Sequence, residues 1–328
     1  MKKNVFFILK LVLVLGLFGG LIYHVNFSNL VESFRNLRFQ PFFIGLVFFI
    51  CATFFDILRL YILLRIYELS FRFVFRLYFV GLFFSNFLFS NVGGDAYRVF
   101  ALRQKYDEWM KPIVLISFDR LMGLGILVTA GCLIVLMDFN RIVDLARQHQ
   151  LSLQVNIHPV WLLVCAGLGI LIGGYFFLFK KSWFDRFLRL GWEKYDSFRH
   201  IIAGIPFTRL SSAFFVAVLF NIARLLRFYF FIRAFGADIH LLDLVVVLSL
   251  TTLVSMLPVT LGSLGIREGT ITVSLAMFGV ALPQGLAVAL LNRVVVWVVS
   301  ALGGIFFIQE GLSLRSIQAR IETVHDPV

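Results

Sequence analysis

Residues 41–64 read PFFIGLVFFICATFFDILRLYILL, in which Asp56 and Arg59 are the only charged side chains. A helix needs about 20 mainly apolar residues to cross a bilayer, so this stretch predicts a membrane span. The rest of the chain is similar, because 60% of its 328 residues are hydrophobic and only 15% are charged. Apolar segments lie near 5–23, 41–64, 73–90, 112–137, 159–179, 211–235, 242–257 and 283–309, with a half-helix at 266–280. The sequence therefore predicts an all-α polytopic membrane protein.

The basic residues between these segments contradict a topology in which every segment crosses. With the N-terminus inside and all segments crossing, the loop 180–210, which has seven Lys and Arg residues, lies outside, and so does the basic loop 92–111. Lys and Arg concentrate in cytoplasmic loops. Both loops become cytoplasmic if 73–90 and the segment after it form a re-entrant hairpin, and the C-terminus does too if 242–280 forms a second one. We predict about six full spans, two re-entrant helical hairpins and cytoplasmic termini.

Charged and amide residues recur in the same order in the two halves of the chain. In the first unit, 41–137, an Asp-x-x-Arg pair precedes an acid, and an Asp-Arg pair follows that acid by 24 and 25 residues. In the second unit, 206–310, an Asn-x-x-Arg pair, an acid and an Asn-Arg pair have the same spacing. The corresponding residues are Asp56 and Asn221, Arg59 and Arg224, Asp95 and Glu268, Asp119 and Asn292, and Arg120 and Arg293. Because the predicted topology starts the units on opposite sides, we predict two inverted repeats, as in many transporters.

Each predicted hairpin turns at a glycine-rich motif, SNVGGDAYR at 90–98 and LPVTLGSLGIREG at 257–269. The glycines of these breaks are Gly93, Gly94, Gly262 and Gly265. They allow a tight reversal or a close approach of two backbones. Asp95 is well placed as the N-cap of the following helix. Arg98 and Arg267 lie near helix starts, whose free N–H groups suit a phosphate.

Ionisable side chains inside apolar segments are costly and usually face a cavity or one another. Here arginines outnumber acids by six to three. The residues are Asp56, Arg59, Asp119, Arg120, Arg224, Arg227, Arg267, Glu268 and Arg293. Structural salt bridges explain some of them, and the surplus of arginine indicates an anionic ligand such as a lipid phosphate. The predicted phosphate ligands are Arg59, Arg98, Arg224 and Arg267.

Patterns typical of catalysis are largely absent from the sequence. The histidines form no i, i+4 pair, and there is neither a G-x-S-x-G motif nor a nucleotide-binding loop. The first outer loop, 24–40, has Glu32 as its single acidic residue. It therefore lacks the pair of acidic residues that would hold a metal and a sugar-phosphate donor. The net charge of +12 fits attachment to an anionic lipid surface and not to nucleic acid. We expect no enzymatic activity, no cofactor and no metal.

Three motifs resemble a known family. They are NVGGDAYR at 91–98, FDRLMGL at 118–124 and LPVTLGSLGIREG at 257–269, and they are similar to the flippase-like transmembrane domain of the lysylphosphatidylglycerol synthases. Asn91 stands where proline is often seen, and Asp119 where glutamate is often seen, which leaves the substrate open. The motif positions that the resemblance implies are Gly93, Gly94, Asp95, Arg98, Asp119, Arg120, Gly262, Gly265, Arg267 and Glu268.

The resemblance implies a protein of the cytoplasmic membrane of a bacterium or archaeon that moves a lipid between leaflets. The full synthases carry a soluble domain that transfers lysine from its tRNA to phosphatidylglycerol. This chain ends at Val328. We therefore expect a stand-alone transmembrane domain, 1–312, a cytoplasmic tail, 313–328, and no aminoacyl-transferase domain.

Three functions are compatible with these features. The first is a lipid translocator that moves an anionic phospholipid or a lipid-linked precursor. The second is a membrane transferase acting on a lipid phosphate, with Asp95 or Glu268 as the general base. The third is a non-transporting partner of a cell-envelope synthesis complex. The sequence favours the translocator, because it contains no donor-binding domain.

Overall fold

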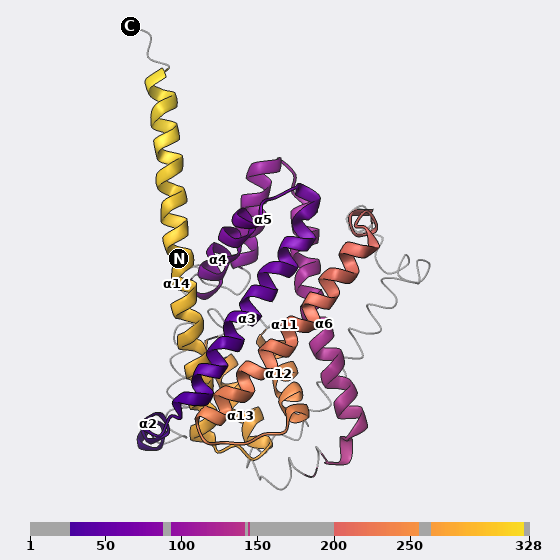
Figure 1. Ribbon diagram of the computed structural model, residues 1–328, viewed down its shortest axis with the longest axis vertical. Helices are drawn as coiled ribbons and strands as arrows, with labels where there is room; N and C mark the ends of the chain where they lie inside the picture. Colours follow the sequence, from indigo (N-terminus) through magenta and orange to yellow (C-terminus); the bar gives the residue numbers. More distant parts are fainter. Residues whose placement is uncertain (1–26, 88–92, 142–143, 145–199, 256–263, 325–328) are drawn as a thin grey trace, which may run out of the picture.

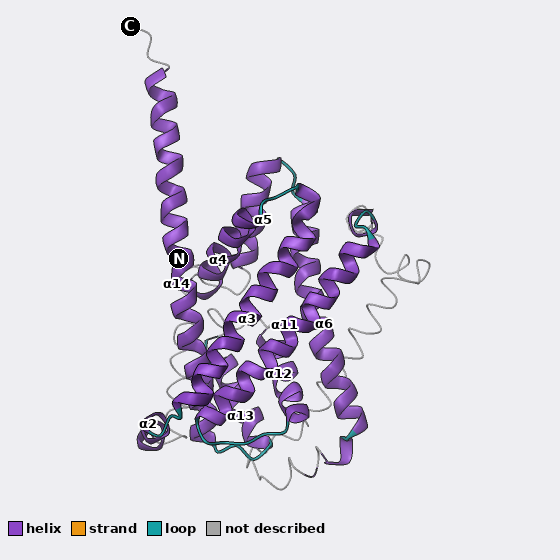
Figure 2. Cartoon of the chain, in the orientation of Figure 1, coloured by secondary structure: helices purple, strands orange, loops and turns teal. Residues whose placement is uncertain are grey.

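The computed structural model describes residues 27–87, 93–141, 144, 200–255 and 264–324. These residues form helices joined by short connections, with no strand among them (Figure 2). The helices are α2 (Phe27–Arg35), α3 (Phe39–Leu64), the 3-10 helix η1 (Arg65–Tyr67), α4 (Phe71–Phe87), α5 (Gly93–Tyr106), α6 (Met110–Met137), α11 (Phe207–Ala234), α12 (Leu241–Ser255), α13 (Ile266–Met277) and α14 (Leu282–Val324). The predicted all-α class is confirmed.

Four described helices are long and apolar enough to cross a membrane. They are Phe39–Tyr67, Met110–Met137, Phe207–Ala234 and Leu282–Gln309. A helix suits this environment because it satisfies its own backbone hydrogen bonds where water is absent. Each of the four overlaps a predicted span. The other two predicted spans, 5–23 and 159–179, lie outside the described residues.

The first predicted hairpin is formed by α4 and α5. The rings of Phe84 and Tyr97 stack with centroids 4.8 Å apart, and Lys105 Nζ lies 4.4 Å from the centroid of the Phe73 ring, so the helices are antiparallel. A Cβ atom on Gly94 would overlap the backbone of α4, so the predicted close approach is confirmed. The two helices have 17 and 14 residues, or about 25 and 21 Å, which is shorter than a bilayer core of about 30 Å.

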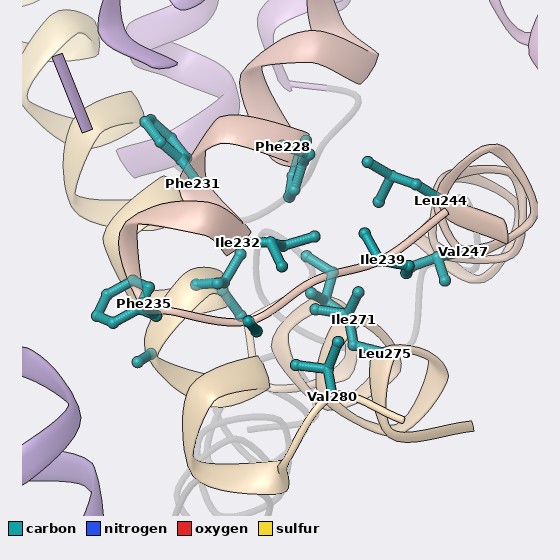
Figure 3. Close-up of a cluster of buried hydrophobic side chains, with 14 of the residues drawn as sticks. Phe228, Phe231, Ile232, Phe235, Ile239, Leu244, Val247, Ile271, Leu275 and Val280 are labelled. Carbon is teal, nitrogen blue, oxygen red and sulfur yellow. The ribbon is translucent and has the colours of Figure 1, made fainter. Parts of the chain in front are cut away.

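The second predicted hairpin is formed by α12 and α13, which pack against each other through apolar side chains. Figure 3 shows Leu244 and Val247 of α12 near Ile271 and Leu275 of α13, in one buried cluster. These helices have 15 and 12 residues, or about 22 and 18 Å. Both hairpins therefore exist as contacting pairs of short helices, and their re-entrant placement in a bilayer stays a prediction.

Helices α3 and α11, the first helices of the two units, lie side by side and run antiparallel (Figure 1). The N–H of Arg38, before α3, donates to the carbonyl of Ala234 at the end of α11, at 2.8 Å. Further along, the Arg59 guanidinium lies 5.2 Å from the centroid of the Phe220 ring, on the preceding half of α11. Opposite directions for corresponding helices are what inverted repeats require.

The last helix of each unit packs against the hairpin of the other unit. Helix α6 of the first unit packs against α12, where Ser249 Oγ donates to the carbonyl of Leu127 at 2.8 Å. Helix α14 of the second unit packs against α4, where Asn86 Nδ2 donates to Ser300 Oγ at 2.9 Å. Each hairpin is therefore held by the last helix of the other unit. This reciprocal contact supports the division into two units, whose limits at 41–137 and 206–310 stay a prediction.

Candidate functional site

Arg59 lies at the centre of a buried ion-pair network in the first unit. Its Nε and Nη2 donate to the two carboxylate oxygens of Asp119, at 2.6 and 2.9 Å. Nη2 also lies 2.8 Å from one oxygen of Asp56, whose other oxygen accepts a hydrogen bond of 2.8 Å from the Tyr78 hydroxyl. Arg59 and Asp119 are buried. Two carboxylates therefore compensate the single charge of Arg59.

Asp95 connects two further arginines of the first unit. Its Oδ1 lies 3.3 Å from Arg98 Nη1, and its Oδ2 forms an ion pair with Arg120 Nε. The Arg98 guanidinium also lies 5.0 Å from the centroid of the Tyr78 ring. The predicted N-cap role of Asp95 is wrong, because α5 already begins at Gly93 and Asp95 lies inside its first turn. The carboxylate there holds arginines of α5 and α6 instead of capping the helix.

Glu268 holds the corresponding position in the second unit. Its Oε1 accepts a hydrogen bond of 2.5 Å from Arg293 Nε, and its Oε2 accepts one of 2.8 Å from the Gly265 N–H. Gly265 has a φ of 81°, a conformation that favours glycine, and it precedes the first residue of α13. The Glu268–Arg293 pair joins residues 25 apart, as the Asp95–Arg120 pair does. The two spacing motifs found in the sequence therefore form corresponding ion pairs.

Three other arginines of the second unit interact electrostatically and have no ion pair to a carboxylate in the described residues, although Asp56 acts on Arg224 and Glu268 acts on Arg267. Arg227 interacts electrostatically with Arg224, which precedes it by one helical turn, and with Arg267 at the start of α13. Arg224 Nη2 donates to Thr252 Oγ1 at 2.8 Å. Within the described part of the chain, Arg227 and Arg267 have neither an ion pair nor a hydrogen bond. We call these three residues the arginine cluster.

Arg227 is the most buried member of the arginine cluster, with 7% of its surface exposed. Its guanidinium lies 5.2 Å from the ring centroid of Phe49 and 4.8 Å from that of Phe228. Its Nε is buried and has no hydrogen-bond partner among the described residues. A buried guanidinium with donors left over is the arrangement that an anion would complete.

Two asparagines replace the carboxylates that would compensate Arg224 by analogy with Arg59. Asn221 and Asn292 correspond to the two aspartates that hold Arg59, and both are buried. Asn221 Nδ2 donates to the backbone carbonyls of Gly123 and Ala217, at 3.3 and 2.9 Å. The side-chain oxygens of both asparagines are buried without a hydrogen-bond partner in the described residues. An amide is neutral, so Arg224 lacks the two carboxylates that compensate Arg59, and Arg227 and Arg267 stand where the first unit has Ile62 and Gly94.

The structure thus divides the four predicted phosphate ligands into two kinds. Arg59 and Arg98 are held by carboxylates, whereas Arg224 and Arg267 belong to the arginine cluster. The carboxylate-bound arginines lie near the arginine cluster, because Asp56, which binds Arg59, also interacts electrostatically with Arg224. The predicted motif residue Gly262 lies outside the described residues.

Arg227 was predicted as an ionisable residue in an apolar segment but not as one of the phosphate ligands, although it lies with Arg224 and Arg267 in the structure. The available signal was its position three residues after Arg224, because residues at i and i+3 lie on one face of a helix. In the described ranges, no group of three or more His, Cys, Asp or Glu side chains could hold a metal ion. The chemistry of the cluster is that of an anion site.

The fold and the site together define a class: an all-α membrane protein whose apolar helices bury ion pairs and an uncompensated group of arginines. Comparison with known families is more specific. The model of the lysylphosphatidylglycerol synthase transmembrane region matches residues 7–304, and the chain belongs to this family. The family resemblance expected from the three motifs is therefore confirmed.

A similar protein is a UPF0104 membrane protein from Methanothermobacter thermautotrophicus, which is 34% identical over 104 residues. The match covers 31% of this chain and 28% of the relative. No solved structure matches the chain. The family model describes a transmembrane region, which agrees with a chain in which sequence analysis finds no catalytic motif.

Proposed function

We propose that this protein is a lipid translocator that moves an anionic phospholipid or a lipid-linked precursor across the cytoplasmic membrane, with both termini in the cytoplasm. The observation that carries the proposal is the arginine cluster. Arg224, Arg227 and Arg267 bring three positive charges together inside a helical membrane protein, with no ion pair to any of them in the described residues. Such charges are costly at membrane depth and mark ligand pathways.

A lipid phosphate matches the arginine cluster in charge and in geometry. Guanidinium groups bind phosphate oxygens through paired, charge-assisted hydrogen bonds. Arg267 is the second residue of α13, where the free N–H groups of a helix start add further donors for an anion. The acyl chains would stay in the surrounding lipid while the headgroup occupies the protein interior.

The arrangement of the two units supports movement of such a headgroup. The cluster combines residues of α11 and α13, and Arg227 also interacts electrostatically with Tyr78 on the other hairpin. A site between inverted units can be opened to either side when one unit rocks against the other. The reciprocal contacts of α6 with α12 and of α14 with α4 would couple the two hairpins during that motion.

The transferase alternative has less support from the described residues. Its two candidate general bases are Asp95 and Glu268, and each is already bound by arginine. A general base needs an oxygen within reach of the proton that it removes. A covalent change in lipid extracts after expression would nevertheless favour a transferase over a translocator.

Reconstitution into liposomes tests the proposal. A fluorescent anionic phospholipid placed in both leaflets is bleached from outside, and translocation is measured as loss of the protected inner fraction. We expect the wild-type protein to accelerate this loss and the double variant Arg224→Gln/Arg267→Gln to be slower by at least about tenfold, because two charge-assisted contacts are removed.

Arg233→Gln is the matched control for the translocation experiment. Arg233 is on the same helix but pairs with Asp238, and 44% of its side chain is exposed. It should translocate lipid at the wild-type rate. Equal rates for the double variant and the wild type would contradict the role of the arginine cluster, and no acceleration by the wild type would contradict the translocator.

A further inference from the structure

The ion pairs around the arginine cluster allow the charge of its ligand to be assessed. The connected residues are Arg59, Arg224, Arg227, Arg267 and Arg293 with Asp56, Asp119 and Glu268. Five guanidinium groups face three carboxylates, which leaves two positive charges without compensation. The undescribed link between α12 and α13, residues 256–263, contains no acidic residue that could neutralise them.

The adjacent group around Asp95 does not reduce this excess. It contains one carboxylate and two arginines, and 38% of the Arg120 side chain is exposed at the protein surface. The excess of two charges is therefore a minimum for the buried part of the described network. Buried charges are retained in proteins when they are paired, and the missing partner must carry the opposite charge.

We infer that the site takes a lipid headgroup with two negative charges, a phosphate monoester or a diphosphate diester, in preference to a phosphodiester with one. This inference rests on the proposed function for its ligand class, and it adds the charge state of the headgroup. A phosphate monoester carries about −1.5 to −2 at pH 7 because its second pKa is about 6. Its terminal oxygens can accept from three guanidinium groups, whereas a phosphodiester has only two free oxygens.

The pattern of asparagines gives an independent reason for this charge. In the first unit, Asp56 and Asp119 compensate Arg59. In the second unit, the corresponding residues are Asn221 and Asn292, and the oxygens of both amides have no partner in the described residues. Two carboxylates are thus replaced by two neutral groups. A ligand with two negative charges restores the balance that the first unit has by itself.

Binding to the purified full-length protein in detergent tests the inference without a transport assay. The probes are phosphatidic acid and phosphatidylglycerol with identical acyl chains, and glycerol 3-phosphate as the headgroup without chains. Affinity is measured by ligand-dependent thermal stabilisation and by native mass spectrometry. At pH 8 we expect phosphatidic acid to bind about tenfold or more tightly than phosphatidylglycerol, the effect of one further charge-assisted contact. At pH 5, where the monoester has lost its second charge, the preference should fall to about threefold or less.

Variants at Arg227 connect this preference to the arginine cluster. At pH 8, Arg227→Gln should reduce the preference for phosphatidic acid over phosphatidylglycerol to about twofold. Arg227→Lys keeps the positive charge and should retain most of this preference. Arg233→Gln should leave it unchanged. The unfolding temperature of each ligand-free variant shows whether it has folded, so that a lost preference in a folded variant reports on the site.

The outcomes separate the two proposals. Equal binding of the two lipids at pH 8, or a preference that does not change with pH, would overturn the dianion inference even if translocation is observed. A pH-dependent preference in a protein that moves no lipid would sustain the inference and refute the translocator. Binding of glycerol 3-phosphate as tight as that of phosphatidic acid would identify a free phosphate ester as the source of the dianion, whereas much weaker binding would identify the lipid.

Discussion

The two units have the same order of helices but differ in how their buried charges are compensated. In the first unit, Arg59 lies between two aspartates, so the arginine is compensated within the protein. In the second unit, Arg224 has the corresponding position, and its hydrogen-bond partner is the hydroxyl of Thr252. Within the described residues, the first unit thus compensates its central arginine, and the second is left with an excess of positive charge. The difference arises because aspartates at two positions of the first unit are asparagines in the second, and because Arg227 and Arg267 stand where the first unit has Ile62 and Gly94.

The largest expected effect contrasts the same substitution in the two units. Arg59→Met leaves the buried Asp119 without its partner and Asp56, whose side chain is 22% exposed, with only the Tyr78 hydroxyl, and should lower the free energy of unfolding by about 3 kcal/mol. Arg227→Met removes an uncompensated charge that lies between aromatic rings, and should raise the ligand-free stability by about 1 kcal/mol. Thermal unfolding in detergent without added lipid measures both. Shifts of the same sign would contradict the comparison.

A second contrast concerns the two corresponding ion pairs. Glu268→Gln breaks a pair in which the side chains are 1% and 6% exposed, and should cost about 3 kcal/mol. Asp95→Asn breaks a pair with Arg120, whose side chain is 38% exposed, and a longer contact of 3.3 Å with Arg98, and should cost about 1–2 kcal/mol because Arg120 is less buried than Arg293 and the contact with Arg98 is long. The unfolding temperatures of the two variants provide the measurement. A larger loss for Asp95→Asn would show that burial does not set the strength of these pairs.

A third experiment changes an asparagine of the second unit to the aspartate that the first unit has at the corresponding position. Asn292→Asp supplies a carboxylate where the first unit has Asp119, and the Asn292 side-chain oxygen has no partner to lose in the described residues. We expect the ligand-free protein to gain about 1 kcal/mol and the affinity for phosphatidic acid at pH 8 to fall about tenfold. Asn36→Asp, on an exposed residue before α3, is the control and should change neither quantity. Unchanged affinity in Asn292→Asp would argue against charge balance as the basis of binding.

The smallest effect is expected at the hydroxyl that binds Arg224. Thr252→Val removes its hydrogen bond of 2.8 Å and should cost about 0.5–1.5 kcal/mol, with less than about a threefold change in lipid affinity. Thr53→Val is the matched control, because that hydroxyl bonds only the carbonyl of Phe49 in its own helix, at 2.9 Å. The difference between the two unfolding temperatures isolates the contact to Arg224. No difference would mean that Thr252 does not stabilise the arginine.

Much of the fold could be predicted, because membrane helices follow directly from apolar length. The predicted spans 41–64, 112–137 and 211–235 agree with α3, α6 and α11 to within a few residues. The hairpins could be predicted because basic loops restrict the topology. The end of α14 could not, because the helix continues to Val324 beyond the apolar segment, through residues that favour helix without being apolar.

The candidate site was predicted less completely, because charge pairing depends on contacts between distant helices. The sequence indicated an excess of arginine and the repeated 25-residue spacing, but not that Arg120 and Arg293 bind the acids at that spacing. It also treated Arg59 and Arg224 alike. Their partners lie on α6 for Arg59 and on α12 for Arg224, and only packing brings those helices together.

The sequence by itself determined that the chain is a helical membrane protein with two glycine-rich hairpins. It also determined that two similar series of charged and amide residues occur along the chain. These properties depend on local composition and spacing, which need no tertiary contact to be read. Only the tertiary structure decided which arginines are compensated, because an ion pair requires two side chains within about 4 Å and these come from different helices. The contact of α3 with α6 brings Asp119 to Arg59, and the arginine cluster combines residues of α11 and α13, two helices that both pack against α12.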